Sequence, residues 1–327
     1  MVRRRARTLA GIVAGFAATS VLAAPAAAAV AGTAPRDPYP TEFALPTGFL
    51  PEGIAIGGGP LAYFGSRADG DIFRVDLTTG AGAVVSQGPG AGNPSVGIKL
   101  DDCDRLFVSG GGAGNARVVS VRTGQILASY QFVVPVPGAN NTFINDVVLT
   151  PSGAYYTESR SAVLFYLPSG RHGELPTQAE VQPIPLAGDW APDSSGVTPS
   201  ANGIARTPDG AALIVVASNT GKLFRVDPRT GTATAIDLGG ETVVNGDGLL
   251  VSGKTLYVVQ NRLNTVAVIQ LNDRGTAGTV KQRVTDVRFD VPTTIAKFGD
   301  RLYLPNARFG IASPETATYN AVAIPKP

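Results

Sequence analysis

The fold is decided by a repeated stretch, DIFRVDLTTG at residues 71–80 and KLFRVDPRTG at residues 222–231. Four related segments accompany these two: RVVSVRTG (117–124), VLFYLPSG (163–170), AVIQLNDRG (267–275) and YNAVAIPKP (319–327). A short apolar segment precedes each copy: AYF (62–64), LFV (106–108), YYT (155–157), LIV (213–215), LYV (256–258) and LYL (302–304). The middle residues of these segments lie 44, 49, 58, 43 and 46 positions apart, so the chain contains six copies of one unit.

A unit of about 45 residues with four short strands is typical of a β-propeller blade. After residue 40 the chain has no convincing amphipathic helix, and its 40 Gly and 25 Pro residues divide it into short apolar or alternating runs. We therefore predict an all-β fold, a six-bladed β-propeller over residues 41–327. The segment TEFALPTGF (41–49) is left over, and we expect it to pair with NAVAIPKP (320–327) and close the last blade. A β-sandwich is the alternative, but a sandwich does not require six matched units.

The N-terminal segment has the layout of a secretory signal peptide. It begins with arginines, continues with an apolar run from Leu9 to Ala24, and ends in small residues. The run stops at Pro25 and is shorter than the roughly 20 residues that span a bilayer, which argues against the alternative of an uncleaved membrane anchor. We expect a signal peptide at residues 1–31, cleaved after Ala29 or Ala31, and a disordered Pro-rich leader at 32–40. The protein is then secreted and has no membrane attachment after cleavage.

Composition excludes several classes of function. The 327 residues include 27 Lys+Arg and 25 Asp+Glu, and four of the arginines lie within the first seven residues. The remainder is close to neutral, so no nucleic-acid partner is expected. Cys103 and His172 are the only residues of their types, which excludes an intrachain disulfide, a thiolate zinc site and a catalytic histidine pair within one chain. We expect a monomer that acts on a small molecule.

Oxygen-bearing side chains recur at one position of the repeat. The innermost strands of a propeller line its axis, so equivalent positions at their starts face one another. Counting back 10 to 12 residues from each apolar segment's middle residue leads to Glu52, Val96, Asn145, Asn202, Asp247 and Pro292. Four of these six carry carboxylate or amide oxygens, which suit a hard divalent cation. We predict a metal site formed by Glu52, Asn145, Asn202 and Asp247, with Ca²⁺ as first choice and Mg²⁺, Mn²⁺ or Zn²⁺ as alternatives.

Each of these residues also has a plain structural interpretation. Asn-Gly and Asp-Gly are routine turn pairs, and Asn202-Gly203 or Asp247-Gly248 alone would be weak evidence. Their common phase in the repeat favours the metal site. Residues that end the second strands should border the same mouth of the channel: Arg67, Ser159, Asn219, Asn261 and Asn306. These are candidate substrate contacts, with solvated loop residues as the alternative.

The spacing of 58 places an insertion between the third and fourth units. Residues 169–199 contain both His172 and Trp190. A surface loop is the interpretation we favour for His172, and Trp190 either belongs to that loop or covers the pocket.

Four motifs resemble those of a known family: EGIAI (52–56), NDVVLTPSGAYYTES (145–159), ANGIARTPDGAALIVVASN (201–219) and GDGLLVSGKTLYVV (246–259). In order and spacing they are similar to the senescence marker protein / gluconolactonase family of regucalcin-like six-bladed propellers. The resemblance implies that Glu52, Asn202 and Asp247 bind the metal, that Asn145 is a ligand or a substrate contact, and that Asp247 is also the general base. Where sugar-lactone members often carry an arginine, this chain has Phe143, which favours a more apolar lactone or ester.

The resulting functional hypothesis is a secreted, metal-dependent hydrolase of a lactone or ester. Asp247 is the predicted catalytic residue, and Asn145, Arg67, Asn219 and Asn261 are the predicted substrate contacts. Neither a G-x-S-x-G elbow nor a second histidine is present, so water rather than a side chain is the expected nucleophile. The alternative is a non-catalytic extracellular propeller that binds a ligand or partner and contains a structural metal.

Overall fold

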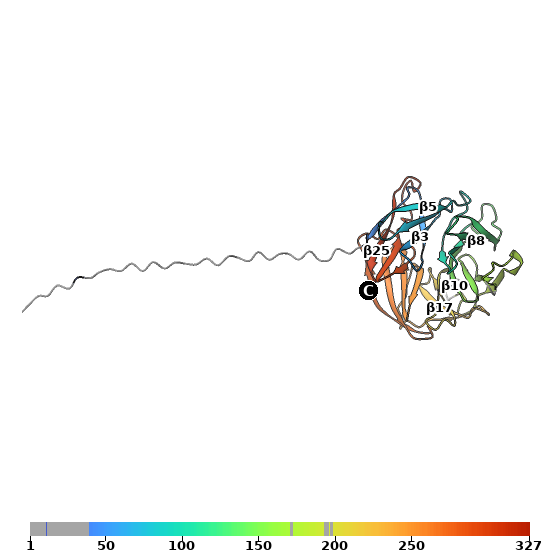
Figure 1. Ribbon diagram of the computed structural model, residues 1–327. Coiled ribbons are helices and arrows are strands. Elements are labelled where there is room, and N and C mark those ends of the chain that lie inside the picture. Colours follow the sequence, from blue (N-terminus) through green and yellow to red (C-terminus); the bar gives the residue numbers. More distant parts are fainter. Residues whose placement is uncertain (1–10, 12–38, 171–172, 193–195, 197–198) are drawn as a thin grey trace, which may run out of the picture. The chain divides into compact units, whose positions relative to one another are not determined.

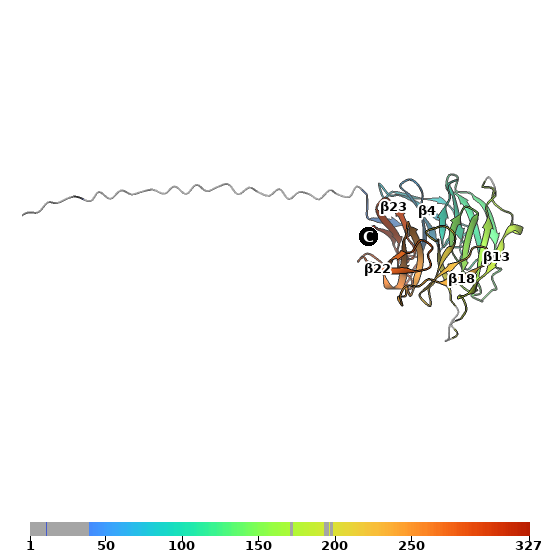
Figure 2. The same ribbon diagram turned by 90° about the horizontal axis from the view of Figure 1, so that it is seen from below.

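Six antiparallel sheets are arranged around a common axis, as predicted (Figures 1 and 2). The computed structural model describes residues 11, 39–170, 173–192, 196 and 199–327. The predicted signal peptide, most of the predicted leader and His172 lie outside the described residues. In Figure 1 the colours pass from blue through green and yellow to red around the ring, so successive blades are neighbours in space.

Each blade consists of consecutive strands that run from the axis outward. The first contains β2 (Pro51–Ile56), β3 (Leu61–Ser66), β4 (Ile72–Asp76) and β5 (Gly82–Ser86), and the second β6 (Ile98–Leu100), β7 (Arg105–Ser109), β8 (Asn115–Ser120) and β9 (Ile126–Gln131). The third contains β10 (Ile144–Thr150), β11 (Gly153–Glu158), β12 (Val163–Pro168) and β13 (Gln182–Pro185). The fourth contains β15 (Ala201–Arg206), β16 (Leu213–Ala217), β17 (Lys222–Val226) and β18 (Thr232–Ala235), with β14 (Ala187–Gly188) added in parallel to β18. The fifth contains β19 (Gly246–Ser252), β20 (Thr255–Gln260), β21 (Thr265–Leu271) and β22 (Gly278–Thr285).

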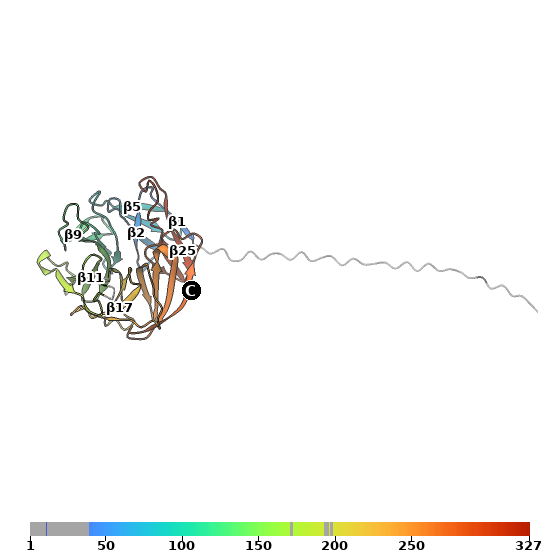
Figure 3. The ribbon, with the colours of Figure 1, turned by 180° about the vertical axis from the view of Figure 1, so that it is seen from behind.

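The sixth blade joins the two ends of the propeller. It contains β23 (Ala296–Phe298), β24 (Arg301–Pro305) and β25 (Tyr319–Pro325), and its outermost strand is β1 (Glu42–Leu45). β1 pairs antiparallel with β25, from Glu42 opposite Val322 to Leu45 opposite Tyr319, and Figure 3 shows the two strands side by side. The predicted closure by the N-terminal strand is therefore confirmed.

The core is divided among the interfaces between neighbouring blades. Six clusters of buried apolar side chains are present in the described part of the chain, and each joins two adjacent blades, including the sixth and the first. The six residues that marked the repeat are all buried in second strands: Tyr63, Phe107, Tyr156, Ile214, Tyr257 and Tyr303. The 45-residue period thus arises because every blade presents the same buried strand to its neighbours.

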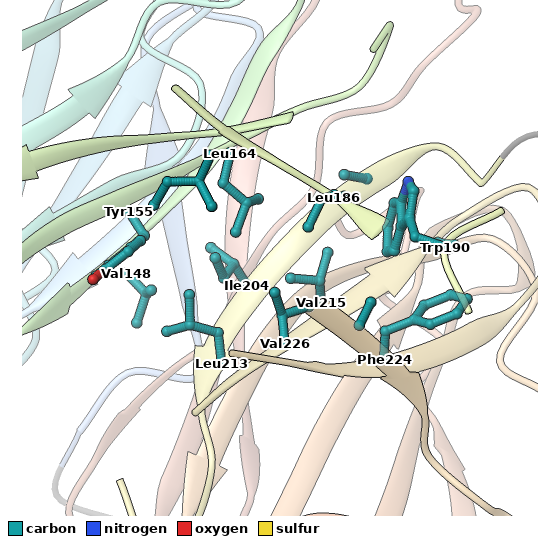
Figure 4. Close-up of a cluster of buried hydrophobic side chains, with 14 residues drawn as sticks. Val148, Tyr155, Leu164, Leu186, Trp190, Ile204, Leu213, Val215, Phe224 and Val226 are labelled. Atoms are coloured by element: carbon teal, nitrogen blue, oxygen red, sulfur yellow. The ribbon is translucent and has the colours of Figure 1, made fainter. Parts of the chain in front are cut away.

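Trp190 belongs to the core and does not cover the axial region. Its side chain is 2% exposed, and its rings lie 4.7 Å from the Phe224 ring, in the cluster between the third and fourth blades (Figure 4). The interpretation of Trp190 as a pocket cover is therefore wrong: the insertion folds back and fills space between two blades.

Helices are minor elements of the described residues. They comprise two 3₁₀ turns, η1 (Gln178–Glu180) and η2 (Asn261–Leu263). Within this part of the chain, no helix has both the length and the apolar character required to traverse a bilayer.

Truncation of Phe43 tests the closure of the ring. Phe43 lies on β1, is 1% exposed and packs against Tyr303 with ring centroids 5.9 Å apart. We expect Phe43→Ala to lower the free energy of unfolding by about 3–5 kcal/mol, because it opens a cavity at the only junction where strands from both ends of the propeller meet. Val287→Ala, at a fully exposed apolar residue, should change it by less than about 0.5 kcal/mol. Denaturant titration measures both, and equal effects would contradict the assigned role of β1.

Candidate functional site

The four predicted metal ligands lie in equivalent irregularities of four inner strands. In β2, β10, β15 and β19, one extra residue interrupts the pairing with the second strand of the same blade. The interruptions lie between Pro51 and Ile54, Ile144 and Val147, Ala201 and Ile204, and Gly246 and Leu249. They contain, in that order, Glu52, Asn145, Asn202 and Asp247, which we call the axial cluster. A bulge redirects the side chains within it, so the four members leave the regular strand alternation at the same point of the repeat.

Hydrogen bonds between neighbouring blades bring the cluster's positions together around the axis. Asn145 O accepts a hydrogen bond from Gly97 N (2.9 Å), and Asn202 O accepts one from Thr157 Oγ1 (2.6 Å). Glu52 O accepts a hydrogen bond from Thr293 Oγ1 (2.7 Å) across the junction of the sixth and first blades. The backbone at three of the four cluster positions is thus bonded to an adjacent blade, and at the fourth the following residue, Gly248, donates to Thr293 O.

The glycines that follow cluster members are required for close packing and do not form turns. A Cβ on Gly203 would lie 2.1 Å from Asp247 O, and one on Gly53 would lie 2.1 Å from Val96 O. A Cβ on Gly248 would lie 2.1 Å from Thr294 Oγ1. The alternative interpretation of Asn202-Gly203 and Asp247-Gly248 as ordinary turn pairs is therefore wrong, because both pairs lie within strands.

Hydrogen bonding determines which atom of Asn145 remains available. Asn145 Nδ2 donates to Ser159 Oγ (2.9 Å), and Ser159 Oγ donates to Ala201 O (2.5 Å). A serine hydroxyl has one proton, so it must accept from the asparagine, and only the amide NH₂ can supply that bond. The Asn145 carbonyl oxygen is therefore the atom left for another ligand.

Asn202 has the same arrangement one blade further on. Its Nδ2 donates to Ser218 Oγ (2.8 Å), and Ser218 Oγ donates to Gly246 O. Asn202 Oδ1 is buried and has no hydrogen-bond partner among the described residues. A buried carbonyl oxygen is rarely left unpaired, and one that is held in this orientation has the chemistry of a cation ligand.

The two carboxylates of the axial cluster are nearly buried, with Glu52 7% and Asp247 4% exposed. Asn261 Nδ2 donates to Asp247 Oδ2 (2.7 Å) and holds that carboxylate in place. Burial, followed by repulsion from Asp247 and Asp146, raises the pKa of Glu52 well above its usual range. Burial also raises the pKa of Asp247 to about 7, although the hydrogen bond from Asn261 opposes the shift. The cluster therefore concentrates negative charge that a bound cation would stabilise.

Asp146 is a third buried carboxylate, for which no role was predicted from the sequence. It is 5% exposed, its Oδ1 lies 3.3 Å from Lys99 Nζ, and its Oδ2 accepts a hydrogen bond from Ile204 N (3.3 Å). Its position directly after Asn145 was the available signal, but the sequence did not reveal the contact with Lys99.

Arg67 lies close enough to the cluster for its charge to interact with both carboxylates. Burial lowers the pKa of its guanidinium, and the charges of Glu52 and Asp247 oppose that shift. The guanidinium stacks on Phe309, 4.5 Å from the ring centroid, and Arg262 lies 5.9 Å from the same centroid. Arg67 Nε is buried without a hydrogen-bond partner among the described residues. Phe309 was missed because it lies in the irregular connection between β24 and β25, outside the repeat.

The remaining second-strand-end residues differ in their surroundings. Asn261 contacts Asp247, as described, whereas exposed Asn219 accepts a hydrogen bond from Ser200 N (2.9 Å) at its side-chain oxygen. Asn306 is 1% exposed and bonds to Asp290 N, Arg288 O and Asn320 Oδ1. The interpretation of Asn306 as a free substrate contact is therefore wrong, because it cross-links loops of the sixth blade.

The metal prediction depends on amide as well as carboxylate oxygens. Among the residues that the structure describes, no three His, Cys, Asp or Glu side chains form a group that could hold a metal ion. The axial cluster contributes only two carboxylates, and its other two ligands are asparagines. The assignment of a cation to it remains a prediction.

Comparison with known proteins identifies the fold. No protein-family model matches the sequence, and a search of the curated proteins finds no match. Among solved structures, the calcium-binding protein regucalcin from Agrobacterium tumefaciens matches with a TM-score of 0.60 and 16% identity, over 87% of this chain and 94% of that one. The Malassezia sympodialis allergen Mala s 1 matches with a TM-score of 0.62 and 14% identity, over 87% and 96%. A luciferin-regenerating enzyme matches with a TM-score of 0.57 and 13% identity, over 85% and 92%. The predicted resemblance to regucalcin-like propellers is thus confirmed for the six-bladed fold.

The raised pKa of Asp247 leads to a prediction for the metal-free protein. An unfolded Asp titrates near pH 4, so a carboxyl with a pKa of about 7 in the fold destabilises the fold progressively as pH rises between these values. We expect the free energy of unfolding of EDTA-treated protein to fall between pH 5 and pH 8. Ca²⁺ should restore more stability at pH 8 than at pH 5.

Two variants separate this effect from general acid or base sensitivity. Asp247→Asn should reduce the pH-dependent loss and abolish the stabilisation by Ca²⁺, whereas Asp102→Asn, at an exposed carboxylate, should behave as wild type. Thermal denaturation at both pH values measures this, and an unchanged Ca²⁺ response in Asp247→Asn would exclude Asp247 as a ligand.

Proposed function

We propose that this chain is a metal-dependent hydrolase of a lactone or ester, with its metal held by Glu52, Asn145, Asn202 and Asp247. One observation carries the proposal: Asn202 Oδ1 is buried, has no hydrogen-bond partner among the described residues, and belongs to a side chain that lies beside the buried Asp247 carboxylate. An oxygen-only ligand set favours Ca²⁺ over softer metals. The fold shared with a calcium-binding protein supports this choice.

The chemistry requires no covalent enzyme intermediate. A divalent cation at the cluster would polarise the acyl carbonyl. Asp247, held by Asn261, accepts a proton from the attacking water as the water oxygen bonds to the acyl carbon. The acyl carbon–oxygen bond then breaks, and the proton passes to the departing alkoxide, so the products are an acid and an alcohol.

The surroundings of the cluster support a substrate with an apolar portion. Phe143 and Val96 approach each other around Gly111, where a Cβ would lie 3.4 Å from the Phe143 ring and 3.0 Å from the Val96 side chain. Arg67 supplies a guanidinium near the carboxylates, which can donate to a carbonyl oxygen of the substrate. The apolar side chains of Phe143 and Val96 favour an apolar lactone or ester over a polyhydroxylated sugar acid.

We also propose that the protein is exported and acts outside the cell. The proposal rests on the basic start, apolar run and small residues of the segment 1–31. N-terminal sequencing of protein recovered from the culture medium of an expressing bacterium should find a chain that begins at Val30 or Gly32. Recovery of the full-length chain from the cell fraction alone would contradict it.

Replacement of Asp247 tests the catalytic assignment. In a screen of aliphatic lactones and aryl esters with Ca²⁺ present, Asp247→Asn should lower kcat/KM by about 10²–10⁴-fold, because it removes the proton acceptor. Asp102→Asn should retain wild-type turnover. If Ca²⁺ stabilises the protein but the wild type hydrolyses no compound in the panel, the binding-propeller alternative is favoured instead.

Replacement of Arg67 tests the predicted substrate contact. Arg67→Met keeps much of the apolar stem that packs near Phe309 but removes the guanidinium. We expect KM for the best substrate to rise about tenfold with kcat changed less, which is a loss of about 1.4 kcal/mol of binding. A loss confined to kcat would show that Arg67 acts on the carboxylates rather than on the substrate.

A further inference from the structure

A second cavity lies on the same inner strands as the axial cluster, nearer their C-terminal ends. Its volume is about 480 Å³, and four consecutive blades line it, with Lys99 from the second, Val148 from the third, residues 204–210 from the fourth, and residues 249–251 and Gly253 from the fifth. Ile204 and Leu249 follow Asn202 and Asp247 by two residues each, which at about 3.3 Å per residue places them roughly 7 Å further along their strands. The cavity therefore lies further along the inner strands than the axial cluster, and no member of the cluster lines it.

The lining of this cavity includes two cationic side chains, Lys99 and Arg206, of which Arg206 has no ion-pair partner among the described residues. Arg206 ends β15, its Nε is buried, and this atom has no hydrogen-bond partner among the described residues. No carboxylate in that part of the chain lies within ion-pair distance of Arg206, whereas Lys99 is paired with Asp146 at 3.3 Å. The guanidinium lies against the tight turn at Gly210, where a Cβ would come within 2.6 Å of Nη2. Arg206 therefore presents a positioned and uncompensated cation.

The other lining residues restrict the charge and shape of an occupant. Leu250 and Val251, both partly exposed, supply apolar surface, whereas Ile204 and Leu249 are buried in the core, 0% and 2% exposed. Asp209 is the one acid in the lining, and its Oδ1 accepts hydrogen bonds from Thr207 Oγ1 (2.6 Å) and Ala211 N (3.0 Å) within its own turn. These bonds hold the Asp209 carboxylate within its own turn. Its negative charge still repels an anion in the cavity, and it repels a dianion more than a monoanion. A monoanion with an apolar body matches this combination of groups.

We propose that this cavity is a binding site for a small organic monocarboxylate, whose carboxylate pairs with Arg206 and whose apolar portion lies against the partly exposed Leu250 and Val251. A planar guanidinium can bind a carboxylate through two parallel hydrogen bonds. Lys99, at the second blade's side of the cavity, adds a longer-range attraction while it remains paired with Asp146. The site is independent of the hydrolase proposal, because it uses no member of the axial cluster.

Calorimetric titration with hexanoate and hexanamide tests the proposal on EDTA-treated full-length protein. The two probes have the same shape but differ in charge, so hexanoate should bind at one site per chain and at least tenfold more tightly than hexanamide. Equal affinities would overturn the carboxylate assignment. Tighter binding of inorganic phosphate than of hexanoate would overturn the monoanion assignment.

Four variants at three arginines locate the site. Arg206→Met should weaken hexanoate at least tenfold, and Arg229→Met, at an exposed turn arginine, should leave its affinity within twofold of wild type. Arg206→Lys should retain part of the affinity and, by melting at the wild-type temperature, show that the site still folds. Arg67→Met should also stay within twofold, and if it abolishes binding while Arg206→Met does not, the anion binds beside the axial cluster and the proposal is wrong.

Discussion

The inner strands of neighbouring blades approach so closely at the axis that there is no room for a side chain at several positions. A Cβ at Gly53, Gly203 or Gly248 would meet an atom of the next blade at 2.1 Å. Each of these glycines follows a member of the axial cluster. A position with no room for a side chain is therefore next to a position whose side chain belongs to the cluster. The bulges at these positions accommodate both demands, because two residues there oppose one on the second strand. Close approach of the blades and convergence of the oxygen ligands are therefore one geometrical feature.

This constraint explains how much of the fold and site the sequence could predict. The blades and the cluster recur with the period of the repeat, so counting along the chain located Glu52, Asn145, Asn202 and Asp247 without knowledge of the contacts. Residues outside that period could not be found in the same way. Phe309 meets Arg67 only because distant connections converge, and Trp190 fills an interface because its insertion folds back onto Phe224. Neither contact leaves a periodic pattern, since each occurs once.

The electrostatics of the cluster differ from those of a site selected for stability alone. Two nearly buried carboxylates have raised pKa values because water is excluded and because Asp146 adds a third charge nearby. Such an arrangement costs folding free energy unless a cation or protons neutralise it, and strongly shifted carboxylates cluster at functional sites. The positive charge of Arg67 partly compensates these carboxylates. Among the described residues, however, Arg67 forms no ion pair with the cluster within 4 Å, and its guanidinium stacks on Phe309. A cation at the cluster, as proposed, would neutralise this charge.

Residues at the ends of three second strands bond directly to members of the axial cluster. Ser159, Ser218 and Asn261 each bond to a cluster member, and the two serines also bond to the backbone of the next blade. Because each serine proton is committed to a carbonyl, the serine accepts from the NH₂ of the neighbouring asparagine and leaves that residue's carbonyl oxygen unused. These residues therefore position the ligands, and they transmit the spacing between blades to the geometry of the site. In the sixth blade the equivalent inner residue is Pro292, which has no side-chain acceptor, and Asn306 opposite it forms cross-links with Arg288 and Asn320 instead. The end of the second strand thus orients a cluster side chain in blades whose inner strand carries a cluster member. In the sixth blade, whose inner strand carries none, the same position cross-links the blade itself.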